Sequence, residues 1–280
     1  MFWKSTYNEI IKIAAKPRSY IGLGAITALV GVILFAMKVD GLTYLSFITA
    51  SFEQTLSFQG NILNGNMMAY LVLQTLIIQV PLLVALVTGD LVSGEAAMGN
   101  LRLLATKPIS RTKLLLSKFL AGNFYTFIFL IWLGVLAIGF SRLLFGEGDL
   151  MILKSDGLVI LQSKDVMWRF LSGFVIAYLS LVTVATLSIT LSCFTDNSIG
   201  PIVTTMAIII LFTVIGTLDV PVFDHIRPLL FTTHMASWRS FFYDPIPKQD
   251  IINSVTVLLI HIFGLLGIAL YKFNKKDILS

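Results

Sequence analysis

The sequence predicts an all-α, polytopic membrane protein with six transmembrane helices, and three observations support this fold class. Hydrophobic residues make up 56% of the 280 residues, and the mean hydropathy is +0.88. Charged residues contribute 12%, about half of the ~25% that is typical of soluble domains. Six uncharged stretches approach or exceed the ~20 residues that a helix needs to cross a bilayer. We therefore expect a single membrane-spanning domain over residues 1–280.

The uncharged stretches place the six spans along the chain. The shortest has 19 residues between Arg18 and Lys38, and the longest has 36 residues from Gln54 to Gly89, of which the apolar part begins at Met67. We predict spans at about 19–37, 67–89, 117–141, 170–194, 199–219 and 251–272. Pro81 should kink the second span because proline has no N–H to donate to the helical ladder.

The distribution of basic residues predicts the orientation. Six spans place both termini on one side, and cytoplasmic segments carry an excess of Lys and Arg. With a cytoplasmic amino terminus, the inner segments hold 12 basic and 5 acidic residues, and the outer segments hold 8 basic and 10 acidic residues. We expect a bacterial inner-membrane protein with both termini in the cytoplasm. The net charge of +5 then reflects this topology and anionic lipid, so no nucleic-acid partner is expected.

An amphipathic helix is predicted over residues 2–16, before the first span. Trp3, Tyr7 and Ile11 fall on an apolar arc, whereas Lys4, Lys12 and other polar residues fill the opposite arc. This pattern favours a helix that lies on the inner leaflet of the membrane. The alternative is a helix packed on a partner subunit. Pro17 should end it.

Three segments outside the spans also carry structural signals. Leu45, Ile48, Phe52 and Leu56 recur at helical spacing and indicate a second interfacial helix. Asp156-Gly157 lies between two apolar runs in 151–163, which indicates either an external β-hairpin or a short loop. The stretch 220–250 is polar and broken by prolines, so short interfacial or re-entrant helices fit it. Its aromatic residues are interpreted as anchors in the membrane interface; they are Phe231, Trp238, Phe241, Phe242 and Tyr243.

The segment 88–118, between the second and third spans, is the most informative for function. Its sequence predicts a short helix that leaves the membrane, a turn at Pro108 and a new helix capped by Ser110. Glu95 and Arg102 are seven residues apart and therefore share one helical face. Nothing in this segment can perform chemistry alone, and a charged cytoplasmic helix between two spans is suited to contact another protein.

Several short motifs in this segment resemble the signature of type-2 ATP-binding-cassette (ABC) transporter permeases. They are Gly94-Glu95, Gly99-Asn-Leu-Arg-Leu-Leu, Lys107-Pro-Ile-Ser-Arg111 and Leu116-Ser-Lys118. Asn100 departs from the threonine usual in that family. The tail from Tyr271 to Ile278 and the turn from Ser192 to Asn197 are also similar to the family pattern. Within the family, the chain is most similar to permeases with an external loop after the first span, including the subunit that serves nitrous-oxide reductase maturation.

This resemblance implies a partner and a mechanism. A coupling helix at about residues 91–106 would dock on a separate ATPase subunit, with Glu95 and Arg102 as polar contacts and Gly94, Gly99 and Arg111 as further motif residues. Two permeases, as a homodimer or with a paralogue, would join two ATPase subunits that bind ATP and Mg²⁺. ATP-driven closure would rock the spans as rigid bodies. The family mostly exports its cargo.

The resemblance also implies a substrate route between the two permeases, along spans two and five. Gln74 and Gln79 in span two are candidate lining residues. Ordinary interhelical hydrogen bonding, worth about 0.6 kcal/mol each, is an equal alternative for them.

The absence of known motifs argues against catalysis by this chain. The sequence has no Gly-x-x-x-x-Gly-Lys-Ser/Thr loop, no His-Glu-x-x-His, no Gly-x-Ser-x-Gly and no Cys-x-x-Cys, so it is not expected to be an enzyme or to bind a cofactor. An ion-gradient-driven secondary transporter and, less favoured, an intramembrane enzyme are the alternatives. Both normally need intramembrane charges, which the six stretches lack.

The three histidines do not form a metal-binding pattern. His225 and His234 are interpreted as interfacial polar residues rather than metal ligands, because no ligand spacing accompanies them. His261 lies within the sixth span, where we expect a neutral imidazole hydrogen-bonded to a neighbouring helix.

Overall fold

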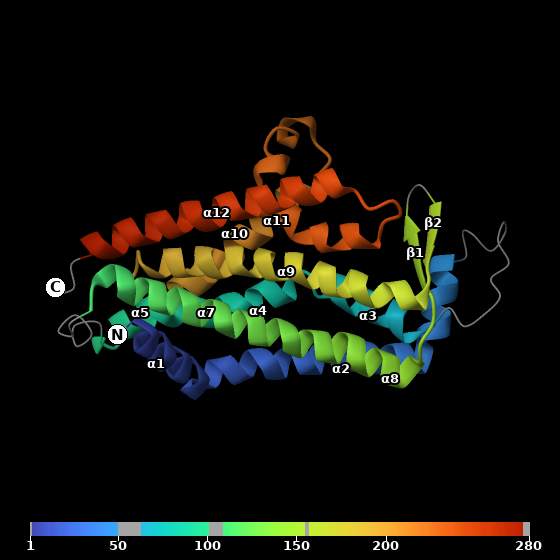
Figure 1. Ribbon diagram of the computed structural model, residues 1–280, viewed down its shortest axis with the longest axis horizontal. Coiled ribbons are helices and arrows are strands. Elements are labelled where there is room, and N and C mark those ends of the chain that lie inside the picture. The colour runs from blue at the N-terminus through green and yellow to red at the C-terminus, as the bar shows by residue number, and fades with distance from the viewer. Residues whose placement is uncertain (1, 50–62, 101–108, 155–156, 277–280) are drawn as a thin grey trace.

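The protein is an all-α bundle with six helices that are long and apolar enough to cross a membrane (Figure 1). A computed structural model describes residues 2–49, 63–100, 109–154 and 157–276. The candidate spans are Pro17–Gly41, Gln79–Ala97, Arg111–Phe145, Ser163–Ser192, Gly200–Thr217 and Lys248–Lys275. The predicted fold class and number of spans are therefore confirmed.

The helix α9 (Ser163–Ser192) forms the centre of the bundle. It packs against α12 (Lys248–Lys275), α7 (Arg111–Gly134), α4 (Gln79–Thr88) and α10 (Gly200–Thr217). In its span 67% of the most apolar window is buried, against 17% for α12 and 22% for α10. The outer helices therefore leave most of their apolar surface for lipid or another chain. The first helix α1 (Phe2–Ala15) and the end of α12 lie at the same end of the bundle (Figure 1).

The second span is broken where proline predicted a kink. The helix α3 (Gly65–Thr75) ends, Leu76–Ile78 form a turn, and α4 begins at Gln79. Pro81 has no N–H to donate to the Ile77 carbonyl, so the ladder is interrupted there. The predicted span 67–89 corresponds to α3 and α4. The segment that is long and apolar enough to cross a membrane is instead Gln79–Ala97, because α5 (Asp90–Ala97) continues α4 after Gly89.

The amino-terminal helices α1 and α2 follow the predicted pattern. In α1 the apolar arc faces outward, with Trp3, Tyr7 and Ile11 exposed, and Glu9 and Ile13 are buried against the bundle. The helix α2 (Pro17–Thr49) crosses the bundle and has a non-helical residue at Asp40. The interfacial helix predicted around Leu45 and Ile48 is thus a continuation of α2 beyond this kink, and its Phe52 and Leu56 lie outside the described residues.

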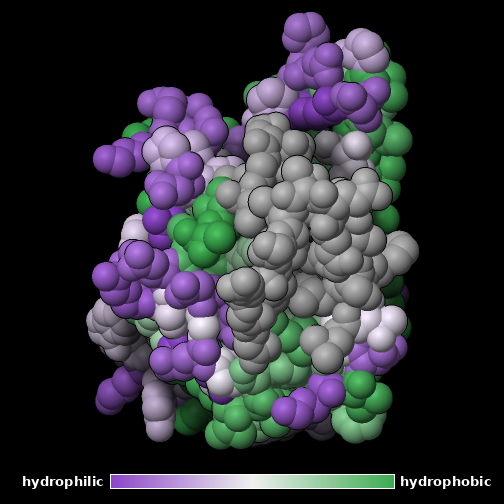
Figure 2. Space-filling view, turned by 90° about the vertical axis from the view of Figure 1, so that its right-hand side faces the viewer, coloured by the Kyte–Doolittle hydropathy of each residue, from purple (hydrophilic) through white to green (hydrophobic). Residues whose placement is uncertain are grey.

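The β-hairpin is confirmed, with a shifted turn. Strands β1 (Leu150–Lys154) and β2 (Gly157–Leu161) pair antiparallel, and Lys154 is opposite Gly157. Gly157 therefore belongs to the strand, and the connection is 155–156 rather than Asp156-Gly157. The hairpin follows η1 (Val135–Phe140) and α8 (Ser141–Phe145) at the end of the third span. Figure 2 looks onto this end of the bundle and shows clusters of hydrophilic residues there.

The stretch 220–250 forms the short helices that its prolines predicted, but three of its aromatic residues, Phe231, Trp238 and Phe242, do not act as interface anchors. The elements are η2 (Pro221–Phe223), η3 (Arg227–Leu229), α11 (Phe231–Met235) and η4 (Ala236–Phe242). The side chains of Phe231, Trp238 and Phe242 are buried in the protein. Trp238 and Phe242 pack with Tyr70 and Phe170, with ring centroids 4.9–5.8 Å apart. The interpretation as anchors is wrong for these three because η4 folds back against α9.

Candidate functional site

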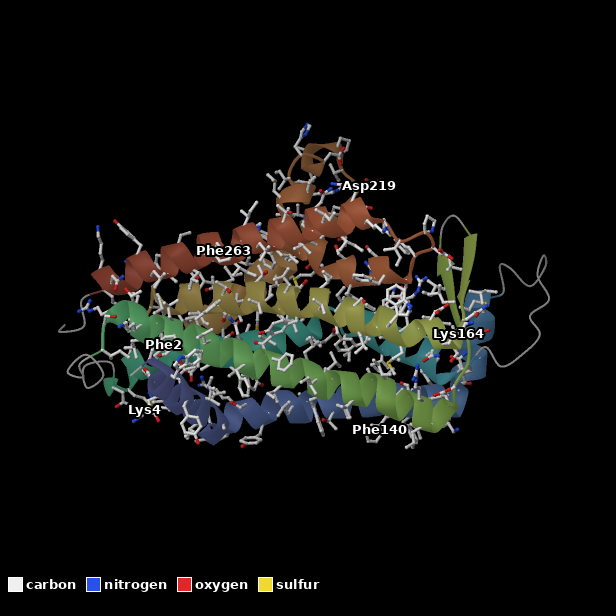
Figure 3. All side chains as sticks on the ribbon, in the orientation of Figure 1. Phe2, Lys4, Phe140, Lys164, Asp219 and Phe263 are labelled. Atoms are coloured by element: carbon white, nitrogen blue, oxygen red, sulfur yellow. The ribbon has the colours of Figure 1, made fainter. Side chains whose placement is uncertain are left out.

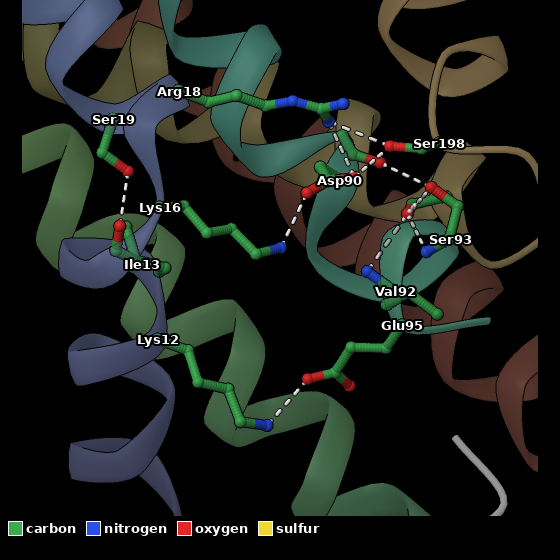
Figure 4. Close-up of polar contacts among 12 residues, drawn as sticks. Lys12, Ile13, Lys16, Arg18, Ser19, Asp90, Val92, Ser93, Glu95 and Ser198 are labelled. Carbon is green, nitrogen blue, oxygen red and sulfur yellow. Dashed lines mark hydrogen bonds and ion pairs between the residues drawn. The ribbon is translucent and has the colours of Figure 1, made fainter. Parts of the chain in front are cut away.

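Four charged side chains form a closed ring where α1, α5 and α7 meet. Lys12 Nζ lies 2.6 Å from Glu9 Oε1 and 2.7 Å from Glu95 Oε1. Lys118 Nζ lies 2.7 Å from Glu9 Oε2 and 2.5 Å from Glu95 Oε2. The last contact is an ion pair without hydrogen-bond geometry, since Glu95 Oε2 has no hydrogen-bond partner. Each carboxylate thus contacts both ammonium groups; the Lys12–Glu95 side is drawn in Figure 4.

Three members of the ring are buried, and the fourth, Lys12, has a side chain that is 42% exposed. The Lys118 side chain is 0% exposed, and those of Glu9 and Glu95 are 4% and 8% exposed. Burial raises the pKa of Glu9, but Lys118 and Lys12 outweigh it and hold this pKa below its usual value of 4.5. Burial likewise lowers the pKa of Lys12, but Glu9 and Glu95 raise it above 10.5. Glu9 and Lys12 therefore remain charged near neutral pH, and the contacts of the ring hold α1 against the bundle.

A second polar cluster surrounds Asp90 at the start of α5 (Figure 4). Its Oδ2 lies 2.7 Å from Lys16 Nζ, and its Oδ1 lies 2.8 Å from Arg18 Nη1 and accepts a hydrogen bond from Ser198 Oγ. Ser198 immediately precedes α10. Asp90 is 5% exposed, so a single buried carboxylate joins the start of the first span to the starts of α5 and α10.

The predicted coupling helix is interrupted in the part that the structure describes. The helix α5 ends at Ala97, and Gly99 has a φ of 71°, a left-handed conformation that glycine adopts without steric cost. The helix predicted at about 91–106 therefore has a break at 98–99, and its residues 101–106 lie outside the described residues. Arg102 lies outside the described residues, so its pairing with Glu95 on one face stays a prediction. Ser110 caps α7 as predicted, and its hydroxyl accepts from the Lys113 N–H at 3.4 Å.

The other candidate coupling residues have internal partners. The Glu95 carboxylate is buried in the ring, which differs from the surface contact that we expected for it. A Cβ on Gly94 would overlap the Asp90 carboxylate, so glycine permits this carboxylate to lie against α5. Arg111 Nη1 donates to the carbonyls of Asn274 and Lys276 at 3.0 and 2.7 Å and ties α7 to the end of α12. The exposed part of this segment begins only at 97–100, where Met98 is 59% exposed.

A polar cavity of about 420 Å³ lies beside the break in the second span. Gln74, Ile77 and Ile78 line it from the break, Thr213 and Thr217 from α10, and α11 and η4 complete the wall. Of the two predicted lining residues, Gln74 lines this cavity and Gln79, which is exposed, does not. The cavity thus lies between spans two and five, where the resemblance implied a substrate route.

The histidines take part in structural contacts. His234 Nδ1 lies 3.0 Å from Ser254 Oγ and joins α11 to α12, and its Nε2 lies 2.8 Å from the Pro228 carbonyl. His261 bonds the Val257 carbonyl of its own helix at 2.9 Å, so the expected partner on a neighbouring helix is wrong; only a ring contact with Phe231 crosses to α11. In the part of the chain that the structure describes, no three His, Cys, Asp or Glu side chains come together.

Sequence reasoning missed four functional candidates. Glu9, Lys12 and Lys118 complete the ring around Glu95, and Arg239 is the charged residue that lines the cavity. Glu9 could have been noticed, because an acidic residue within the basic face of a membrane-surface helix is unusual. Lys118 was placed in the Leu-x-Lys motif, but its partners are distant in the sequence and no local pattern indicates them.

Comparison with known proteins gives a family for the chain. No curated protein matches it. The family described as "Protein of unknown function (DUF2705)" matches residues 25–279, which include α3 to α12, both strands and most of the first span. The match therefore covers the cavity, Asp90, Glu95 and Lys118, and begins after α1. Because it extends over most of its length, the chain belongs to the DUF2705 family.

Proposed function

We propose that this protein is the membrane-spanning permease subunit of an ABC transporter and that a separate cytoplasmic ATPase drives it. Because the family that it resembles mostly exports its cargo, we propose that it works as an exporter. The observation that supports the proposal most strongly is the ring of Glu9, Lys12, Glu95 and Lys118. It joins the segment that carries the permease-like motifs to the amino-terminal helix α1 and to the third span. A displacement of α5 would therefore move α1 and α7 with it.

The cluster around Asp90 extends this linkage to two more spans. Lys16 and Arg18 connect Asp90 to the start of α2, and Ser198 connects it to α10. Packed elements joined by buried ion pairs move as a unit rather than deform, which is the mechanical property that rigid-body gating needs. The proposed mechanism is that an ATPase pushes the exposed residues 97–100 and that α5 transmits the motion through Glu95 and Asp90.

The arrangement favours this mechanism over a gradient-driven one. Secondary transporters place coupling charges near the bilayer midplane. Of the buried charges on the described spanning helices, Lys118 is eight residues into Arg111–Phe145, Arg169 is seven residues into Ser163–Ser192, and Glu95 is two residues before the end of Gln79–Ala97. Asp90 lies further inside Gln79–Ala97, where it pairs with Lys16 and Arg18 at the start of α2. The ring lies at one end of the bundle, where it can transmit motion between helices, and not at the centre, where the ion-binding site of a secondary transporter would be expected.

Site-specific crosslinking tests the proposal. A photoreactive amino acid at Asn100, which is exposed, should crosslink in cells to a protein with a Gly-x-x-x-x-Gly-Lys-Ser/Thr loop, identified by mass spectrometry. The same group at Lys164, at the opposite end of the bundle in Figure 3, is the matched control and should not crosslink to it. A purified chain that transports without nucleotide, or an Asn100 position that is labelled from the outer face, would contradict the proposal.

A further inference from the structure

The cavity between spans two and five has a lining suited to an anionic group. Four threonines and Gln74 surround it with hydroxyl and amide groups; the threonines are Thr213, Thr217, Thr232 and Thr233. Arg239 is the charged residue in the lining. Among the described residues, no Asp or Glu forms an ion pair with Arg239, and its recorded hydrogen bond is a 3.4 Å contact from Nε to the Ala236 carbonyl. Its guanidinium therefore retains most of its five donors for a ligand.

One buried donor in this wall also lacks a partner. Thr232 Oγ1 is shielded from solvent and makes no hydrogen bond. A buried hydroxyl without a partner costs about 1–3 kcal/mol, so such groups are normally satisfied by protein, water or ligand. The hydroxyls of Thr213 and Thr217 already donate to backbone carbonyls of α10, at 2.7 and 3.0 Å. The donors that remain open to the cavity are therefore on Gln74 and Arg239, since the Thr232 hydroxyl is shielded, and together they favour an acceptor-rich, negatively charged group.

The wall that carries Arg239 is firmly held. Arg169 Nη1 on α9 donates to the carbonyls of Phe241 and Tyr243 at 2.7 and 2.9 Å, which fixes the end of η4. The ring of Trp238, next to Arg239, packs on Tyr70 of α3 at 5.6 Å. These contacts place the guanidinium beside the cavity before any ligand arrives, and such preorganisation lowers the entropic cost of binding.

An apolar crevice of about 60 Å³ adjoins the polar cavity. Ile77 and Met235 line both, and the far walls of the crevice are Leu73, Leu130, Phe174 and Trp238. The polar cavity is within the ~300–1,000 Å³ typical of small-molecule sites. The cavity is lined by the last residues of the span Gly200–Thr217 and therefore lies at the end of that span. A pocket with open polar donors and an apolar side at the end of a span matches a molecule with a charged head and a hydrocarbon chain.

We propose that this cavity binds an anionic amphiphile, with its acidic head on Arg239 and Gln74 and its hydrocarbon chain along the apolar side of the same cavity, against Ile77, Ile78 and Met235. The assignment rests on the proposed function only in taking the cavity as part of the transport route. Binding itself requires no ATPase, so it can be measured on the chain alone. The headgroup chemistry is that of a carboxylate or phosphate monoester, and the hydrocarbon chain distinguishes it from a free inorganic anion.

Binding can be measured with a fluorescent fatty acid. The full chain, in nanodiscs of zwitterionic lipid, is titrated with parinaric acid, and energy transfer from tryptophan reports occupancy because Trp238 lines the crevice. We expect saturable binding that Arg239→Gln weakens at least about tenfold, since one charge-assisted hydrogen-bond site is lost. Arg227→Gln is the matched control, because this arginine pairs with Asp219 and Asp224 on the exposed projection outside the cavity. It should leave binding unchanged.

Three results would overturn the assignment. They are equal affinity for the fatty acid and its methyl ester, unchanged binding by Arg239→Gln, and displacement by inorganic phosphate as effective as displacement by a fatty acid. If Arg239→Gln fails to fold, Thr217→Cys in a Cys193→Ser background provides a second measurement, because Thr217 is exposed at the cavity. The fatty acid should slow maleimide labelling of this cysteine severalfold, and the methyl ester should not. Identical labelling rates would reject the site.

The two proposals fail separately. Loss of fatty-acid binding with intact crosslinking from Asn100 would reject the cavity assignment and leave the permease proposal standing. Intact, Arg239-dependent binding without an ATPase crosslink would reject the ABC mechanism and leave an amphiphile-binding membrane protein.

Discussion

Glu9 in the first helix and Glu95 in α5 are bridged by the same two ammonium groups, those of Lys12 and Lys118. Two carboxylates in a buried site repel each other, and the two ammonium groups between them offset this repulsion. Removal of any member leaves an uncompensated buried charge. The ring is consequently a sensitive point for stability, and its members can be tested one at a time.

Replacement of Lys118 should be strongly destabilising. Lys118→Met removes one of the two cations and leaves two carboxylates with Lys12 alone, so we expect a loss of about 3–5 kcal/mol in the free energy of unfolding. Denaturant unfolding in detergent micelles, followed by circular dichroism, measures this loss. The control is Lys113→Met, an exposed position on the same helix, which should change the free energy by less than about 0.5 kcal/mol. Equal effects of the two variants would contradict the buried ring.

The contribution of Glu9 should depend on pH in the acid range. The pKa of Glu9 is lowered in the folded protein, so its ionisation stabilises the fold above about pH 4.5, and this contribution is lost as the pH falls through the folded pKa. Wild type should therefore be more stable than Glu9→Gln at pH 7, and the difference should shrink below pH 4.5. Thermal unfolding of both proteins across this range measures it.

The matched control for that pH series is Glu147→Gln. The Glu147 side chain is 73% exposed and lies 3.9 Å from Arg142, so its replacement should leave a small difference at every pH. A difference between wild type and Glu9→Gln that stays constant down to pH 3 would show that Glu9 is not held ionised by its two lysine partners.

Gly94 should tolerate no side chain. In Gly94→Ala the new methyl group meets the Asp90 carboxylate, which Lys16, Arg18 and Ser198 hold in place, so we expect a loss of about 1–3 kcal/mol. Gly264→Ala in α12 is the matched comparison: nothing lies within 4 Å of its Cβ position, and alanine should stabilise the helix by about 0.5–1 kcal/mol. We expect the free energy of unfolding to fall in Gly94→Ala and to rise in Gly264→Ala. A neutral Gly94→Ala would mean that Asp90 can move freely.

Arg169 should hold α11 and η4 in place. Arg169→Met removes two charge-assisted hydrogen bonds to the carbonyls at the end of η4, and we expect a loss of about 1.5–3 kcal/mol together with increased hydrogen exchange of α11 and η4. Arg142→Met is the comparison at another span end, and it should leave exchange in η4 unchanged. Exchange that rises equally throughout the bundle in both variants would contradict a local anchor.

The local features of the chain could be read from sequence because their causes are local. Span number follows from apolar length, the break before α4 follows from Pro81, the cap of α7 follows from Ser110, and the hairpin follows from two apolar runs around a turn. The turn was placed one residue late, since the sequence alone does not set the strand register. The aromatic residues of 231–242 were misplaced because an amphipathic aromatic suits both a lipid interface and a protein core.

The sequence by itself determined that this is a six-span helical membrane protein, that its second span is broken near Pro81, and which segment carries motifs that resemble those of ABC permeases. Only the tertiary structure decided that Glu95 is buried against Lys12 and Lys118, that Gln74 but not Gln79 lines the cavity, and that Arg239 lies in the same cavity. The reason is physical. Hydrophobic length and proline act over one helical turn to one span, whereas an ion pair or a cavity depends on side chains about 80 to 170 positions apart that only packing brings together.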